Sequence, residues 1–161
     1  MKIIPSLALP AYFPEIDFDL DDIGLADYSF GYISIFDHWL TEAESAACQI
    51  FTYSMAVESN MLPDYLTGEN KFLKFYSELA NAGMICNHPS PLRLINDDDE
   101  IQISKIFVDS LREKRLMDVF FIADQVRIIG RYDRTDMLIY KKSEDISSLL
   151  QKIKNYGLNF L

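Results

Sequence analysis

Five aspartates lie close together near the start of the chain, in the stretch EIDFDLDDIGLADYSF, which runs from Glu15 to Phe30. They are Asp17, Asp19, Asp21, Asp22 and Asp27. Carboxylates at this density suit three kinds of site: a calcium loop, a catalytic pair of carboxylates, or an acidic surface for a basic partner. The residues around them decide between these alternatives.

The calcium loop fits poorly. Asp17, Asp19 and Asp21 match the first three ligand positions of an EF-hand loop. The sixth position, which needs glycine for a sharp turn, is Asp22, and the twelfth, which needs a bidentate acid, is Tyr28. We therefore predict no metal site in this stretch.

A catalytic D-x-D pair is disfavoured by what precedes it. Such a phosphotransferase nucleophile follows a buried apolar strand, whereas here Pro14 and Glu15 occupy that place. The chain also lacks a P-loop, a dinucleotide-binding glycine motif and the G-x-S-x-G motif of hydrolases. We expect no catalytic residue and no cofactor.

Two cysteines and two histidines are the other candidates for nucleophile, base or metal ligand. Cys86 and His88 supply only two ligands, and Cys48 and His38 are distant from them without paired spacing, so zinc binding is not predicted. We predict that Cys48 is a small core residue, that His38 is a surface or capping residue, and that both thiols stay reduced. A small hydrolase that uses Cys86 or His88 is a less favoured alternative.

Charge is distributed unevenly along a chain whose net charge is −10. Residues 1–70 contain twelve acidic residues and one basic residue, whereas residues 105–161 contain eleven basic and eight acidic residues. An acidic surface repels nucleic acid and favours encounter with basic partners. The alternative is a regulator or adaptor that binds nucleic acid through a hairpin with Arg127, Arg131 and Arg134, in which the first two share one face of a strand.

Length and composition predict one globular domain, residues 1–161, in the cytoplasm. The 161 residues are 49% hydrophobic, which is enough for a sizeable core. No apolar run reaches eighteen residues, so we predict no membrane span. Pro5, Pro10 and Pro14 interrupt the apolar start, so we predict no signal peptide.

The hydrophobic periodicity predicts an α+β fold with about four helices. Thr41 and Glu44 form a capping box that begins the first helix, and Pro63 is expected to close that segment. Residues 86–95 are expected to form a loop that leads into a short strand. The predicted helices span residues 41–60, 68–82, about 103–111 and 144–156, an N-terminal strand pair spans 16–20 and 28–36, and an antiparallel β-meander spans 119–123, 126–132 and 137–140.

The acidic stretch is predicted to be displayed at the surface. In the first predicted strand aspartates alternate with Ile16, Phe18 and Leu20, which places the carboxylates on the solvent face. Aromatic anchors beside carboxylates are what an interface with a basic protein needs. The predicted partner-binding residues are Asp17, Asp19, Asp21, Asp22, Asp27, Tyr28, Tyr32 and Trp39.

In overall character the chain resembles bacterial immunity proteins that protect cells from contact-dependent inhibition toxins and related polymorphic toxin nucleases. The resemblance rests on a small acidic α+β chain without a catalytic signature, so it assigns no functional residue. It implies binding to a basic toxin domain, commonly a DNase or RNase, and occlusion of its active site or substrate-binding surface, without direct nucleic-acid or membrane binding. A DNA-mimic inhibitor of another enzyme has the same acidic-surface physics, and the sequence does not predict the oligomeric state.

Overall fold

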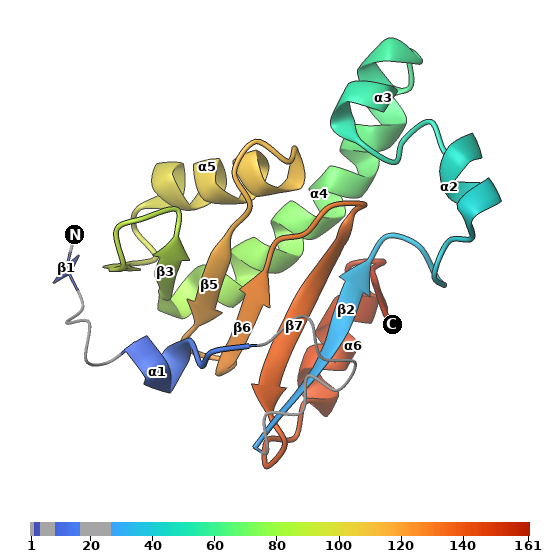
Figure 1. Cartoon of the computed structure of the whole chain (residues 1–161). Helices are drawn as coiled ribbons and strands as arrows, with labels where there is room; N and C mark the ends of the chain where they lie inside the picture. Colours follow the sequence, from blue (N-terminus) through green and yellow to red (C-terminus); the bar gives the residue numbers. More distant parts are fainter. Residues whose placement is uncertain (1, 4–8, 17–26) are drawn as a thin grey trace.

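The computed structural model describes residues 2–3, 9–16 and 27–161 of the chain. Strands from these residues form one antiparallel sheet in the order β1-β4-β3-β5-β6-β7-β2-β8 (Figure 1). The strands are β1 Lys2–Ile3, β2 Tyr28–Ser34, β3 Met84–His88, β4 Arg93–Ile95, β5 Asp118–Phe121, β6 Val126–Ile129, β7 Thr135–Lys141 and β8 Asn159–Phe160. The predicted α+β class and the meander, which is β5-β6-β7, are confirmed.

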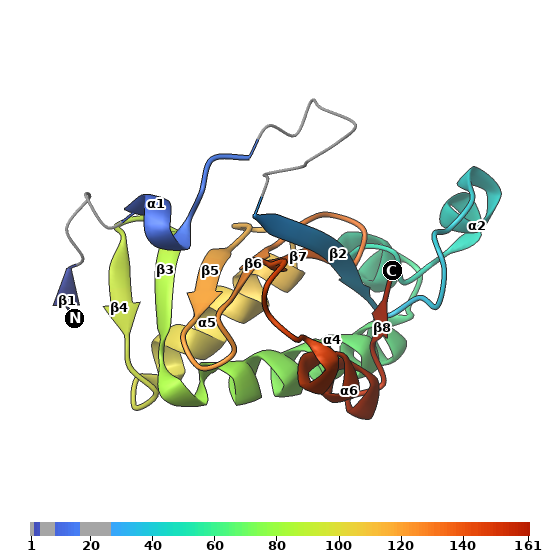
Figure 2. The ribbon, with the colours of Figure 1, turned by 90° about the horizontal axis from the view of Figure 1, so that it is seen from below.

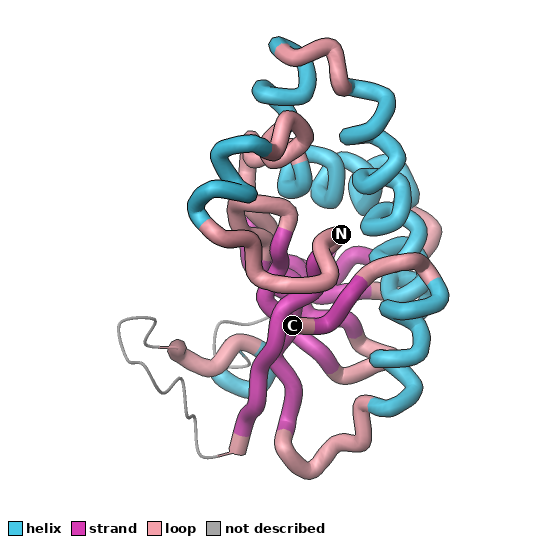
Figure 3. Tube along the Cα trace, turned by 90° about the vertical axis from the view of Figure 1, so that its right-hand side faces the viewer, coloured by secondary structure: helices cyan, strands magenta, loops and turns pink. Residues whose placement is uncertain are grey.

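The long helices lie on one face of this sheet. Figure 2 shows α4, α5 and α6 along that face and α1 on the other, and Figure 3 shows the same layering from the side. Within the described residues, no helix is both long and apolar enough to cross a membrane. The helices are α1 Leu9–Tyr12, α2 Glu42–Ala47, α3 Tyr53–Glu58, α4 Leu62–Leu79, α5 Glu100–Leu111 and α6 Ser147–Asn155, with a 3₁₀ turn at Ala80–Ala82.

The main core lies between α4 and the helix-covered face of the sheet. Apolar residues recur in α4 at the spacing that forms one stripe on a helix. On the sheet, Phe121 and Ile128 meet this stripe, and both are fully buried. The α4 residues of the stripe, all with no exposed surface, are Phe72, Phe75, Tyr76 and Leu79.

A smaller cluster lies on the other face. Phe13, which follows α1, packs there with Ile85 and Phe120. Arg127 of β6 donates to both carboxylate oxygens of Asp118 at 2.7 and 2.8 Å. It also donates to the Pro14 carbonyl at 2.8 Å, which ties the segment after α1 to the sheet.

The predicted helix over residues 41–60 is two helices. The capping box of Thr41 and Glu44 is present and begins α2 as predicted. The chain then becomes extended at Cys48, and the Thr52 hydroxyl accepts from the Met55 amide to cap α3. The cap at Thr52 therefore favours the start of a new helix over the continuation of α2. Cys48 consequently lies at the end of α2 and is half-buried, so its prediction as a core residue is wrong.

Three further corrections concern the chain around α4. The helix begins at Leu62, before the predicted start at residue 68, because Pro63 lies in its first turn, where no amide donor is needed. At its other end α4 stops at Leu79, before the predicted residue 82, and a 3₁₀ turn continues to Ala82. Gly83, predicted as the stop, follows this turn with φ of 83°. Residues 86–88, predicted as loop, belong to β3.

The other predicted elements agree with the structure more closely. Asp99 accepts from the Gln102 amide at 3.2 Å and caps α5, so the acidic run does precede that helix. The last helix is shorter than predicted, and Gly157 with φ of 70° follows its end. Of the predicted N-terminal strand pair, residues 28–34 form β2, whereas residues 17–20 lie outside the described part of the chain.

The ion pair between α4 and the end of α5 yields a test of stability. Glu69 is 3% exposed, and Arg112 donates to both of its carboxylate oxygens at 2.8 Å. Arg112→Ala leaves that carboxylate buried without its cation, so we expect the free energy of unfolding to fall by roughly 3 kcal/mol. Urea denaturation measures this loss.

Lys105→Ala is the matched control because it breaks an exposed pair, 2.8 Å from Asp109 within α5. Such a pair contributes little, so we expect a change within about 0.5 kcal/mol. Similar losses of unfolding free energy in the two variants would contradict the expectation that the buried Glu69 carboxylate depends more strongly on its cation than the exposed Asp109 does.

Candidate protein-binding site

Three aromatic residues form a stripe along the face of β2 that points away from the long helices. Successive side chains of a strand point to opposite faces of the sheet. Ile33 lies in the core on the helix-covered face, so Tyr28, Phe30 and Tyr32 lie on the opposite face. The rings of Phe30 and Tyr32 meet edge to face with centroids 5.9 Å apart. Trp39 extends this stripe with its ring 4.9 Å from that of Tyr32.

Strand neighbours on both sides hold Tyr32 in position. Along its length β2 pairs with β7, so Tyr32 lies opposite Met137. On the other edge, Tyr32 and Leu161 exchange backbone hydrogen bonds of 2.9 and 2.8 Å. The neighbouring Gly31 lets the Phe160 ring approach closely, since a Cβ at this position would lie 2.1 Å from the ring.

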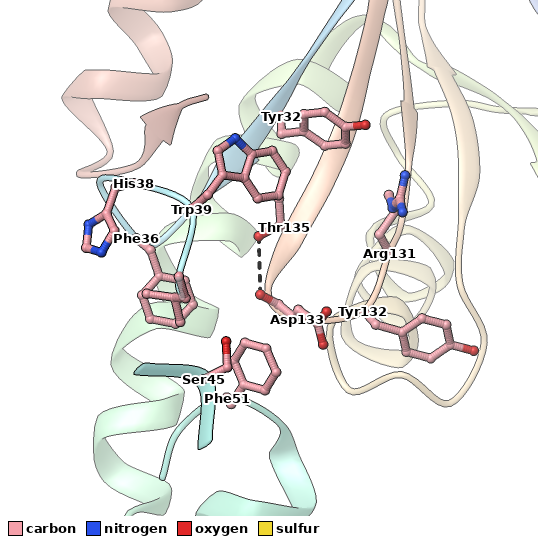
Figure 4. A pocket seen from close by; sticks show the side chains of 11 residues that line it. Tyr32, Phe36, His38, Trp39, Ser45, Phe51, Arg131, Tyr132, Asp133 and Thr135 are labelled. Carbon is pink, nitrogen blue, oxygen red and sulfur yellow. Dashed lines mark hydrogen bonds between the residues drawn. The ribbon is translucent and has the colours of Figure 1, made fainter. Parts of the chain in front are cut away.

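A pocket of about 160 Å³ opens beside Trp39 (Figure 4). It lies where three segments meet: the chain after β2, the region of α2, and the β6–β7 loop. The residues around it are Tyr32, Phe36, His38, Trp39, Leu40, Ser45, Phe51, Arg131, Tyr132, Asp133 and Thr135.

Side chains and a backbone carbonyl of α4 hold the β6–β7 loop in place. The buried carboxylate of Asp136 accepts from the Arg131 amide at 2.9 Å and from the hydroxyl of Tyr76. The Arg134 guanidinium lies 4.0 Å from the ring centroid of Tyr65 and donates to the carbonyl of the same residue at 2.9 Å. These contacts fix a loop in which Asp133 and Arg134 have positive φ values of 70° and 55°.

This anchored loop contributes the side chains of Arg131 and Tyr132 to the lining of the pocket. The Arg131 guanidinium lies 5.6 Å from the ring centroid of Tyr32. Tyr132 is 60% exposed and Trp39 is 58% exposed, so both are large apolar side chains in contact with solvent. Trp, Tyr and Arg are the residue types that most often dominate binding energy in protein interfaces.

Acidic groups border the pocket on the α2 side. The exposed His38 ring contacts Asp37 at 2.6 Å and Glu44 at 3.1 Å, and its hydrogen bond to Asp37 contributes most to raising its pKa. The pKa of Glu44 is lowered, chiefly by the hydrogen bond from the Thr41 backbone amide. The arrangement confirms His38 as a surface residue and keeps negative charge beside the pocket.

The structure brings only part of the predicted partner-binding set together. Tyr32 and Trp39 are in contact, whereas Tyr28 lies on the same face at the other end of β2, roughly 13 Å away. Asp27 is exposed just before β2, and its carbonyl accepts from the Lys142 amide. The remaining predicted residues, Asp17, Asp19, Asp21 and Asp22, lie outside the described residues.

Sequence reasoning missed three members of this surface. The alternation of β2 could have identified Phe30, which shares the face of Tyr28 and Tyr32. No local signal brings Tyr132 to the same pocket as Trp39, because the pocket depends on the long-range pairing of β2 with β7. Arg131 was predicted only as part of a nucleic-acid hairpin.

The three arginines of that hairpin do not share a surface. Arg127 and Arg134 are buried at 9% and 6% exposure, and only Arg131 is exposed. The prediction that Arg127 and Arg131 share a strand face is wrong, because β6 ends at Ile129. Two of the three guanidiniums are therefore occupied by contacts within the fold.

The groups considered for chemistry are also separated. Cys86 is fully buried on the helix-covered face, and burial raises the pKa of its thiol to about 11, so little reactive thiolate forms at neutral pH. His88 is exposed at the end of β3. Within residues 2–3, 9–16 and 27–161, no three His, Cys, Asp or Glu side chains gather as metal ligands.

Comparison with protein-family models gave no match, and neither the curated proteins nor the solved structures gave a significant one.

The carboxyl group of Asp136, which supports the β6–β7 loop, leads to a prediction about how stability depends on pH. Burial raises the pKa of Asp136 to about 6, against the opposing hydrogen bonds from Tyr76 and Arg131. The folded state therefore binds the proton more tightly than the unfolded state, and this stabilisation is lost as pH rises from about 4 through about 6. Relative to Asp136→Asn, the wild-type unfolding free energy should fall by about 3 kcal/mol between pH 4 and pH 7.

Urea denaturation of both proteins at several pH values checks this difference. Taking the difference removes the contribution of the other acids, which titrate in both proteins. A difference that stays constant with pH would show that Asp136 does not titrate in this range.

Proposed function

We propose that this chain is a toxin-immunity type inhibitor that binds a basic toxin domain, a nuclease, and occludes its active site or substrate-binding surface. The observation that carries the proposal is a pocket lined by Arg131 and by two exposed aromatic side chains, Trp39 and Tyr132. Asp133 also lines it, and Asp37 and Glu44 contact the lining residue His38. This composition suits a protein interface, with large rigid anchors and charge around them.

The charge of the surrounding chain supports a basic partner. Asp37, Glu42 and Glu44 are exposed on the segment that carries Trp39. No Lys or Arg occurs between residues 3 and 70, so within this segment only His38, which contacts Asp37 and Glu44, offsets the negative charge. Such a field speeds the encounter with a cationic protein and makes the association rate depend on salt.

Inhibition then follows from competition for one cationic surface. A nuclease must bind phosphates with Lys and Arg, and these same groups attract carboxylates. Once docked, an interface of roughly 800 Å² on each side would cover the cleft and exclude the nucleic acid. The aromatic anchors would supply most of the affinity, and the carboxylates the orientation and the rate.

The alternatives receive less support from the described residues. A nucleic-acid hairpin requires free guanidiniums, but Asp118 binds Arg127 and the Tyr65 carbonyl and ring hold Arg134. A hydrolase based on Cys86 requires an accessible thiolate, whereas this thiol is buried. The two free thiols agree with the proposed location in the cytoplasm, where the protein would meet the incoming toxin.

Identifying the partner is the primary experiment. The tagged protein is used to capture binding proteins from the bacterium that produces it, or from one that produces a candidate toxin, at low and high salt. We expect a basic nuclease domain in a one-to-one complex that has lost its activity on nucleic acid. A complex in which the nuclease stays fully active would contradict the proposed inhibition.

The aromatic anchors generate a prediction about affinity. We expect Trp39→Ala and Tyr132→Ala each to weaken binding of that nuclease by about 30-fold, chiefly through faster dissociation, as loss of an interface hot spot does. Surface plasmon resonance measures both rates, and circular dichroism confirms the fold. Ile101→Ala is the control because Ile101 is also a large exposed apolar residue, at 86%, but lies in α5.

The aspartate stretch gives a separate prediction about rate. Replacing Asp17, Asp19, Asp21 and Asp22 together by Asn should slow association with the nuclease and weaken protection of cells, with the fold intact. The effect on the association rate should shrink as salt is raised, because salt screens the lost attraction. If this variant associates and protects as well as the wild type, these carboxylates do not face the toxin.

A further inference from the structure

A second pocket, of about 200 Å³, lies apart from the aromatic stripe. It is enclosed by one side of α5, the chain between β3 and β4, and the chain that leads into β5. Its polar lining residues are Ser90, Arg93, Gln102, Lys105, Asp109 and Arg115. This pocket is independent of the proposed inhibition. It is unusual because three basic side chains gather there in a protein whose net charge is negative.

Arg93 has donors left over in this pocket. Its side chain is held by hydrogen bonds from Nε to the Gln102 amide oxygen at 3.0 Å and from Nη1 to the carbonyls of Pro89 and Pro91 at 2.6 and 2.8 Å. A guanidinium carries five N–H donors, and the two on Nη2 have no nitrogen or oxygen acceptor among the described residues. The Arg93 side chain also lies against the Cys86 thiol, where it opposes the rise that burial causes in the pKa of that thiol. Arg93 is 7% exposed, and no carboxylate of the described residues lies within 4.0 Å of it.

Three other arginines of the fold are satisfied differently. Arg127 has Asp118 as its counter-ion, and Arg112 has Glu69. Arg134 has no carboxylate, but the Tyr65 ring covers it, and Gly68 lies so close that a Cβ there would be 2.6 Å from the guanidinium. Among these, Arg93 combines burial, the lack of a carboxylate partner and an adjoining pocket.

The charges that face the pocket leave it positive. Lys105 and Arg115 add two cations to Arg93, and Asp109, already paired with Lys105 at 2.8 Å, supplies one anion. The nearby Cys86 thiol is neutral at pH 7, since burial raises its pKa to about 11. A buried guanidinium without an anion is costly, so the site favours binding a counter-ion from solution.

We propose that this pocket binds a phosphate group, either as inorganic phosphate or as a small phosphomonoester. The free Nη2 donors form a preorganised contact at the base, and the Arg115, Lys105 and Ser90 side chains can reach the remaining oxygens from the rim. A phosphate carries nearly two negative charges and several acceptor oxygens, which matches donors arranged on several sides. Beyond about 10 Å the net charge of −10 is screened at ordinary ionic strength, so it does not prevent binding at this local site.

Titration with inorganic phosphate, at constant ionic strength, tests the site by nuclear magnetic resonance. We expect saturable shifts of the backbone amides of Ser90, Gln102 and Arg115 and of the Arg93 Nε–H. Arg115→Ala and Lys105→Gln, which change exposed rim residues, should each weaken phosphate binding by about three- to tenfold. Arg93 itself is kept, because it anchors the chain between β3 and β4.

Lys142→Gln is the control because it removes one positive charge from an exposed residue in the turn after β7. It should leave phosphate affinity unchanged. Equal weakening by this control, shifts that spread over basic residues without saturation, or no shift at the pocket would each overturn the proposal.

Two further ligands define the chemistry. Tighter binding of phosphoserine than of inorganic phosphate assigns the pocket to a phosphomonoester, and the reverse order assigns it to the free ion. Acetate tests a carboxylate at the same ionic strength. If acetate binds more tightly than both phosphate compounds, the assignment to phosphate is wrong.

Discussion

The packing of α4 across the sheet is the interaction on which the rest of the structure depends. Its buried stripe supplies four side chains of the main core, and the same helix carries polar groups that reach outward. Tyr76 holds Asp136, and the Tyr65 carbonyl and ring hold Arg134, so one element fixes both ends of the β6–β7 loop. The exposed side chains of that loop are thereby held in place by the most buried helix in the molecule.

Arginine has several separate uses in this acidic chain. Two arginines neutralise buried carboxylates and join neighbouring elements, and a third is enclosed by an aromatic ring and carbonyl groups. Arg131 reaches the surface, and Arg93 has hydrogen-bond donors to spare. Part of the basic content of the C-terminal part of the sequence therefore holds the fold together, and the number of basic residues there says little about what the protein binds.

Local sequence signals predicted the helices and strands better than the way in which these elements are divided and pair with one another. The meander, the capping box at Thr41, the acidic start of α5 and the glycine after α4 follow from turn and cap chemistry within a few residues, and all are present. The division at Thr52 was missed because two adequate caps compete, and β3 was missed because it is short and is followed by two prolines. For the site, the alternation of side chains in β2 predicts that Tyr28, Phe30 and Tyr32 share one face. The pocket between Trp39 and the β6–β7 loop could not be predicted, because it depends on tertiary pairing that no local pattern encodes.

The position of β2 in the sheet has a consequence for how the protein is made. This strand precedes its partners in sequence by a long interval: Ser34 pairs with Thr135, and Ile33 with Phe160. During synthesis, β2 must wait for most of the chain to emerge before it can be covered, so its aromatic residues stay accessible in the nascent protein. Closing so large a loop is slow, which makes late docking of β2 the step most exposed to misassociation and to chaperone capture. The aromatic stripe of β2 would thus be among the last parts of the molecule to mature.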